Sequence, residues 1–123
     1  MNNYGKKYED LAVLYLKDNG YEIIERNYTA RTGEIDIVAK DGNCIVFVEV
    51  KARKNSSYDP SESVINSKRK KIIRTSLIYL KSKGFNNLGD VDFRYDVISI
   101  KGDINSPSFT LIKDAFSSDK YYL

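Results

Sequence analysis

The alternation of hydrophobic and polar positions predicts two helices and five strands. Between residues 4 and 19 the apolar side chains recur three and four positions apart, as in an amphipathic helix, and Gly20 stands where such a helix ends. Three strands are predicted next, over residues 21–29, 34–40 and 44–53. Only short turns separate them, so they are expected to form an antiparallel meander.

The second half of the chain predicts a long helix and two more strands. After the polar residues 54–59, Asp59 is expected to cap a helix that runs to Lys83 in one piece or two, restarting at Asn66–Ser67, and stops at Gly84. Strands are predicted over residues 91–100 and 109–112, followed by an apolar tail without periodicity over 115–123. Because the helix lies between them, the fourth strand should return parallel to the third by a right-handed crossover.

These elements predict a single α/β domain over residues 1–123. Its sheet should be mixed, with about five strands, and flanked by the N-terminal helix and a basic crossover helix. A chain of 123 residues can bury roughly two-thirds of its unfolded surface, so it can fold without disulfides or structural metals.

Charged residues interrupt two strongly apolar segments, Glu34–Val38 and Ile45–Lys51. A carboxylate in a strand buried on both faces is costly unless a counter-charge or a metal compensates it. Placing Gly42 and Asn43 in a two-residue turn sets Asp36 opposite Glu49, with all these charged side chains on one face. Two neighbouring carboxylates suggest a divalent metal ion between them, bound by oxygen.

The same register sets Glu34 opposite Lys51, which allows a simpler interpretation. Lys51 could neutralise Glu34 or Glu49 as a cross-strand ion pair on a half-exposed strand. However, the face that carries Glu49 and Lys51 is apolar earlier in the strand, at Ile45 and Phe47. Such a change is expected where a core opens into a cleft.

Glu9 is a candidate third carboxylate. In a helix it shares a narrow stripe with Gly5, Ala12 and Leu16, which predicts that it faces the sheet and the cleft. The alternative is a solvated position at the flank of the helix, paired with a neighbouring lysine.

Composition narrows the chemistry. The chain has no histidine, which excludes Ser-His and Cys-His nucleophiles and histidine-bound zinc, so a metal would be oxygen-bound Mg²⁺ or Mn²⁺. The one cysteine, Cys44, is expected to be a structural thiol beside the turn. There is no nucleotide-binding glycine motif, no membrane-spanning run and no secretory signal, so we expect a soluble, cytoplasmic protein without a membrane partner.

Positive charge is concentrated in the second predicted helix. Residues 63–89 contain no acid and seven basic side chains: Lys68, Arg69, Lys70, Lys71, Arg74, Lys81 and Lys83. Such a block can be an ordinary solvated helix face. Beside a carboxylate cluster it favours a phosphate-bearing partner.

The combination of Gly33-Glu34-Ile35-Asp36, a hairpin and Phe47-Val48-Glu49-Val50-Lys51-x-Arg53 resembles the PD-(D/E)xK nuclease superfamily. Within it the chain resembles the bacterial YraN-like family, whose layout is similar to that of archaeal Holliday-junction resolvases. The resemblance extends over nearly the whole chain, from Gly5 to Phe116. The proline of the superfamily name is replaced by Ile35, which is a common departure.

The resemblance implies a restriction-endonuclease-like core and a magnesium-dependent phosphodiesterase site. Asp36, Glu49, Glu9 and the carbonyl of Val50 would bind the metal, and a protonated Lys51 would lie beside the attacking water. Glu34 would hold Lys51 in place. Phosphates flanking the cut would contact the basic residues Arg53, Lys68, Arg69, Lys70, Lys71 and Arg74.

Three functions follow from these observations. The first is a metal-dependent endonuclease acting on branched or structured DNA, and the second is a nucleic-acid-binding or scaffold protein with little intrinsic cleavage. The third is a structural α/β module whose carboxylates bind metal incidentally. Similar resolvases work as dimers, so a homodimer is also considered.

Overall fold

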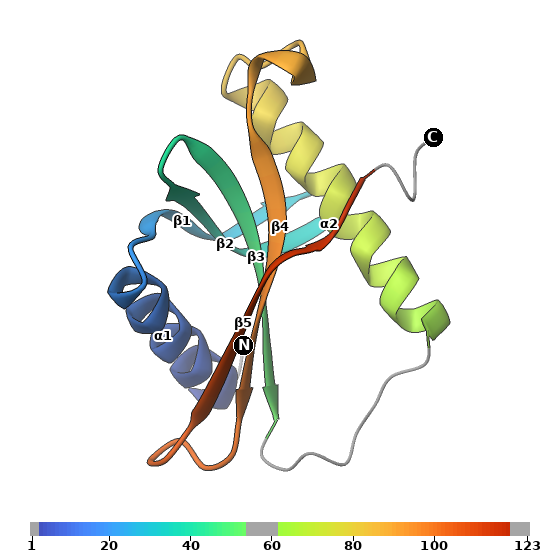
Figure 1. Ribbon diagram of the computed structural model, residues 1–123. Helices are drawn as coiled ribbons and strands as arrows, with labels where there is room; N and C mark the ends of the chain where they lie inside the picture. Colours follow the sequence, from blue (N-terminus) through green and yellow to red (C-terminus); the bar gives the residue numbers. More distant parts are fainter. Residues whose placement is uncertain (1–2, 54–61, 119–123) are drawn as a thin grey trace.

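The computed structural model describes residues 3–53 and 62–118 (Figure 1). The elements run in the order α1 (Asn3–Asp18), β1 (Glu22–Ala30), β2 (Gly33–Asp41), β3 (Cys44–Arg53), α2 (Glu62–Ser82), the 3-10 turn η1 (Leu88–Asp90), β4 (Phe93–Lys101) and β5 (Ser108–Phe116). One sheet has the order β1-β2-β3-β4-β5, with β3 and β4 parallel and the other neighbours antiparallel. The predicted α/β fold, with a meander and a parallel return strand, is confirmed.

The two helices cover opposite faces of the sheet, so the fold has three layers (Figure 1). The α1-side core consists mainly of Tyr8, Ala12, Val13, Leu16, Ile37, Ala39, Val46, Val48, Ile98 and Ile100. The α2-side core consists mainly of Ile35, Val38, Ile45, Phe47, Ile72, Ile73, Tyr79, Leu80, Tyr95, Val97 and Phe116. Residues 45–49 of β3 are buried between the two layers, as their nearly continuous apolar sequence predicts.

The second half departs from the prediction in its two strands. α2 is one continuous helix, which is one of the two predicted forms, and β4 begins at Phe93, after η1. β5 continues to Phe116, four residues beyond the predicted end. A bulge makes this possible: Asp114 has a positive φ of 53°, and beyond it Phe116 stacks on Tyr95 with ring centroids 4.9 Å apart. The expected cap at Asp59 and the residues after 118 lie outside the described part of the chain.

The β2–β3 hairpin has the predicted turn and register, but its ladder is shorter than expected. Gly42 has a φ of 62°, which suits the first position of a two-residue turn. Pairing runs from Asp41–Cys44 to Ile37–Val48 and stops there. The expected continuation through Asp36–Glu49 to Glu34–Lys51 is therefore wrong.

The reason lies in β2, which changes faces at Asp36. Residues two apart in a regular strand share a face, yet Ile35 lies in the α2-side core and Ile37 in the α1-side core. The strand is thus irregular at Asp36, and the side chain of this residue takes up the space between β2 and β3.

Gly33 lets α2 approach the start of β2. Its φ of 148° favours glycine, and a β-carbon there would already be in van der Waals contact with α2, 3.4 Å from Thr75 Oγ1 and 3.6 Å from Lys71 Cβ. Thr75 is also hydrogen-bonded to Thr32 through their hydroxyls, at 2.7 Å. These contacts hold the basic helix beside the end of the sheet where the acidic residues lie.

Within the described residues, neither helix is long and apolar enough to span a bilayer.

Candidate metal centre

Asp36 lies at the point where β2 and β3 separate. Its Oδ2 accepts a hydrogen bond from the backbone N–H of Val50, at 2.8 Å. Burial raises the pKa of this carboxyl to about 6, and the negative charges of Glu9 and Glu49 act in the same direction. The Val50 hydrogen bond and the Lys68 ammonium oppose this shift only in part. The positive charge near Asp36 is therefore too small to offset the cost of burying its ionised carboxylate.

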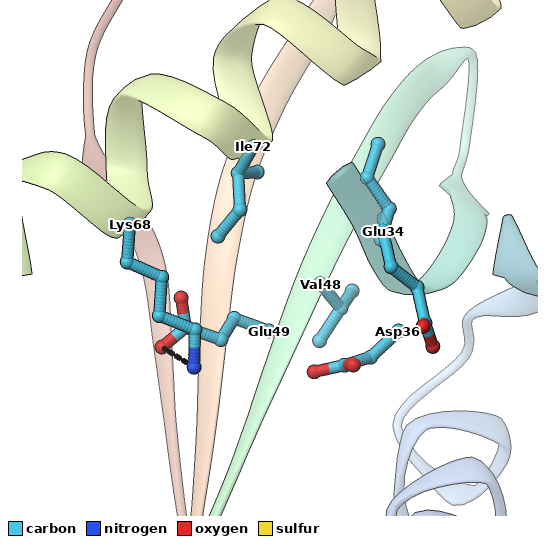
Figure 2. A pocket seen from close by; sticks show the side chains of 7 residues that line it. Glu34, Asp36, Val48, Glu49, Lys68 and Ile72 are labelled. Atoms are coloured by element: carbon cyan, nitrogen blue, oxygen red, sulfur yellow. Dashed lines mark ion pairs between the residues drawn. The ribbon is translucent and has the colours of Figure 1, made fainter. Parts of the chain in front are cut away.

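Glu49 is a buried acid with two lysine partners. Its side chain is 4% exposed, and Oε1 lies 3.6 Å from Lys68 Nζ and 3.8 Å from Lys51 Nζ. Figure 2 shows Lys68 reaching from α2 to this carboxylate. One face of β3 was predicted to change from apolar to charged along the strand, and this is confirmed. Ile45 and Phe47 lie in the α2-side core, and Glu49 follows them on the same face.

A hollow joins the two carboxylates. It is lined by Glu34, Ile35, Asp36, Val48, Glu49, Lys68 and Ile72, so apolar walls meet charged ones there (Figure 2). The expected opening of the core into a cleft is thus present. Asp36 and Glu49 border the hollow together, although they are not partners in the ladder.

Glu34 and Lys51 are not brought together as the register prediction required. Glu34 is exposed and pairs with Thr29 of β1, whereas Lys51 pairs with Ser99 of β4 and contacts Glu49. The physical reason is the early end of the β2–β3 ladder. The simpler interpretation is correct in one respect, since Lys51 does neutralise Glu49.

Glu9 faces the sheet, as its helix stripe predicts. Its side chain is 12% exposed, and Oε1 is buried without a hydrogen-bond partner among the described residues. The nearest cation is Arg26 Nη2 of β1, at 3.7 Å, which itself binds Asp10 Oδ1 at 2.7 Å. The alternative, a solvated flank position, is therefore wrong.

The described residues contain no three acidic, cysteine or histidine side chains grouped so that they could hold a metal ion. Magnesium does not require such a cage, because it commonly binds through one or two carboxylates and completes its shell with water and substrate phosphate. Asp36, with its raised pKa, and the unbonded Glu9 oxygen are suitable donors. The Val50 carbonyl points to the same side of β3 as its N–H, toward Asp36. The available oxygens therefore fit a hard divalent cation in an open site.

The predicted nucleic-acid-binding residues lie around this hollow to different extents. Lys68 is in it, with 58% of its side chain exposed. Arg69 packs its guanidinium on the Phe116 ring at 4.8 Å, and Lys70, Lys71 and Arg74 are exposed on α2. Arg53 is half-buried at the end of β3, opposite Lys101.

A buried ionic network on β4 was not assigned from the sequence. Asp96 is fully buried and accepts hydrogen bonds from Tyr21 Oη at 2.7 Å, Arg94 Nε at 2.9 Å and the Asp114 N–H at 2.9 Å. Arg94 also binds Asp41 at 2.7 Å, which lowers the pKa of that carboxyl. The signal in the sequence is an arginine and an aspartate two positions apart in the strand predicted over residues 91–100.

The mixed five-stranded sheet with a helix on each face is consistent with a restriction-endonuclease-like core. Comparison with known proteins gives the family: residues 8–100 match the uncharacterised protein family UPF0102. The chain is 43% identical over 113 residues to a UPF0102 protein of Syntrophus aciditrophicus (91% of this chain, 87% of the relative). A UPF0102 protein of Clostridium tetani is 44% identical over 123 residues (94% and 98%). The chain belongs to the UPF0102 family, which is the YraN-like group.

Proposed function

We propose that this protein is a Mg²⁺- or Mn²⁺-dependent endonuclease that hydrolyses phosphodiester bonds in branched or structured DNA. The observation that carries the proposal is the hollow, beside a basic helix, that is lined by the half-buried Asp36 and the buried Glu49. A carboxylate pair costs free energy in such a place, and a catalytic cation would offset that cost. Family membership is consistent with this class of enzyme.

Four groups of the chain would hold the cation: the carboxylates of Asp36, Glu49 and Glu9, and the carbonyl of Val50. When bound, the ion lowers the pKa of a water molecule and offsets the charge that develops on the phosphate. Asp36 is already fixed by its bond to the Val50 amide, so its second oxygen is positioned without further ordering.

The lysines would act on the water and the phosphate. Lys51 is 26% exposed and contacts Glu49, so its ammonium can orient a nucleophilic water and donate hydrogen bonds to a phosphate oxygen. Lys68 pairs with Glu49 at 3.6 Å but is more than half exposed, and it can exchange that carboxylate for a substrate phosphate. The exposed basic residues of α2 would contact the phosphates beyond.

A second function, nucleic-acid binding without cleavage, is favoured by two observations. The Lys68 ammonium already compensates Glu49, and the described residues provide no group of three acids for a metal. In that case Lys68 stabilises the folded state by neutralising Glu49. The protein then binds nucleic acid in the cytoplasm as a monomer or homodimer.

Cleavage and binding should be measured on the same substrates. Wild type, Asp36→Asn and Glu49→Gln are tested on four-way junctions, flaps and duplexes with Mg²⁺, Mn²⁺ or EDTA, with Glu34→Gln as an acidic control from the rim of the hollow. An endonuclease loses cleavage in EDTA and in both site variants, whose folding circular dichroism verifies. A binder shows no metal-dependent product, keeps its affinity in both variants and loses it when Lys70, Lys71 and Arg74 are neutralised.

A further inference from the structure

Asn27 of β1 was not assigned to the site from the sequence, yet it occupies an unusual position beside it. In the β1–β2 register Arg26 pairs with Ile37 and Tyr28 with Ile35, which sets Asn27 directly opposite Asp36. Its φ of 54° is left-handed, a conformation that side chains other than glycine adopt rarely and that is often retained at functional sites.

β1 changes faces at Asn27, as β2 does at Asp36. Arg26 reaches Asp10 on α1, whereas the ring of Tyr28 packs edge-on against Tyr79 of α2, with centroids 5.1 Å apart. Residues two apart in a regular strand point to the same face, but Arg26 and Tyr28 point to opposite faces. The strand therefore reverses its facing between them, at Asn27. Two adjacent strands are thus distorted at the same level, next to the hollow.

Among the described residues, three buried side-chain polar atoms lack a hydrogen-bond partner: Glu9 Oε1, Asn27 Oδ1 and Arg26 Nε. Arg26 and Asn27 are neighbours in β1, and Arg26 Nη2 lies 3.7 Å from Glu9 Oε1. The two oxygens come from α1 and β1, and Glu9 interacts electrostatically with Asp36. Buried oxygens without donors are rare in folded proteins, and a hard cation satisfies carboxylate and amide oxygens equally well.

We propose that the Asn27 carboxamide oxygen binds the divalent cation together with Asp36 and Glu9, directly or through one water. This inference deepens the proposed function and rests on it. It assigns a fifth donor, from β1, and it gives a reason for the left-handed conformation of Asn27. The competing explanation is that Arg26 turns its free Nε–H toward the two oxygens, which would make Asn27 a structural residue.

Metal binding tests the inference without any cleavage assay. Mn²⁺ affinity is measured by electron paramagnetic resonance of the free ion, with Mg²⁺ as competitor. Asn27→Gly keeps the backbone conformation and removes the oxygen, so it should bind Mn²⁺ at least tenfold more weakly than wild type. Asn27→Asp retains an oxygen donor and should bind at least as tightly as wild type.

The matched control is Asp114→Gly, because Asp114 has nearly the same φ, 53°, and is exposed on β5. Its Mn²⁺ affinity should equal that of wild type. A second readout needs no variant: the Asn27 side-chain amide signals of ¹⁵N-labelled wild type should shift with Mg²⁺ and broaden with Mn²⁺.

The outcomes separate this inference from the proposed function. Wild-type affinity in Asn27→Gly, or unchanged Asn27 amide signals, overturns the inference while the metal site stands, provided that Asp36→Asn abolishes binding. If wild type itself binds no Mn²⁺, or Asp36→Asn binds it as wild type does, the metal site fails and the role of Asn27 with it.

Discussion

The backbone amide of Val50 is hydrogen-bonded to the side chain of Asp36, at 2.8 Å, where the β2–β3 ladder has just ended. The Asp36 carboxylate therefore links β2 to β3 beyond the end of their ladder, and it also lines the hollow. Because of this double role, a substitution at Asp36 should preserve the acceptor if its effect on the site is to be separated from its effect on the fold.

Asp36→Asn should stabilise the metal-free protein at neutral pH. The pKa of this carboxyl rises from 3.8 to about 6 on folding, so the folded state holds the proton more tightly. This tighter proton binding stabilises the folded state fully below pH 3.8, and the stabilisation is lost as the pH rises through about 6. At pH 7.5 the asparagine variant should be more stable by on the order of 2 kcal/mol. Urea denaturation in EDTA at pH 4 and pH 7.5 measures the difference.

The control for this effect is Glu34→Gln, an exposed acid at the same hollow. It should change stability by less than about 0.5 kcal/mol at both pH values. An Asp36→Asn protein that is less stable than wild type at pH 7.5 contradicts the burial argument.

The two lysines at Glu49 should be energetically coupled. Lys51 and Lys68 lie 3.8 and 3.6 Å from the same Oε1, so either one alone still compensates the buried charge. Each single change to methionine should cost about 1 kcal/mol or less, and the double change clearly more than their sum. Denaturant unfolding of wild type, both single variants and the double variant gives the coupling. Lys70→Met, exposed on the same helix, controls for lost surface charge.

Asp96→Asn should be strongly destabilising. Asp96 is fully buried and paired with Arg94, so its neutral replacement removes one of the two carboxylates that compensate this half-buried guanidinium and leaves Asp41 alone to do so. The expected loss is about 3 kcal/mol or more. The exposed Asp92→Asn should change the free energy of unfolding by less than about 0.5 kcal/mol. Equal effects of the two substitutions would show that the network contributes little.

Gly33→Ala should cost backbone strain without displacing α2. Both Gly33 and Gly20 have positive φ; a methyl group at Gly20 meets no atom within 4 Å, and at Gly33 it makes ordinary van der Waals contact with Thr75 and Lys71. Each substitution should therefore cost about 1 kcal/mol, the strain energy of the left-handed backbone. Thermal unfolding compares them. A clearly larger loss in Gly33→Ala would mean that α2 cannot accommodate the added methyl group.

Local rules were sufficient for much of the fold. Gly42 and Asn43 identified the turn and hence the register near it, and the long helix between β3 and β4 required a parallel return. The helical stripe that contains Ala12 and Leu16 also placed Glu9 on the inner face of α1.

The site itself depended on features with no local signature. The register rule assumes regular strands, and it failed where β2 changes faces at Asp36. Positive φ at Asn27 and Asp114 has only a weak local signal, because asparagine and aspartate adopt this conformation more often than other non-glycine residues but still in a minority of cases. The burial of Asp96 was hidden for a related reason: strict alternation on β4 resembles a solvated face, whereas Tyr21 and the β5 bulge cover it.

The early end of the β2–β3 ladder also has a mechanical consequence. β3 and β4 are paired from Ile45–Phe93 to Arg53–Lys101, whereas β2 and β3 are joined only near their turn, up to Ile37–Val48. The sheet thus consists of two ribbons connected by a short seam, and bending at this seam breaks fewer backbone hydrogen bonds than bending elsewhere. A bulky polyanion entering between the ribbons would therefore part the sheet where the shortest ladder of strand pairs resists it.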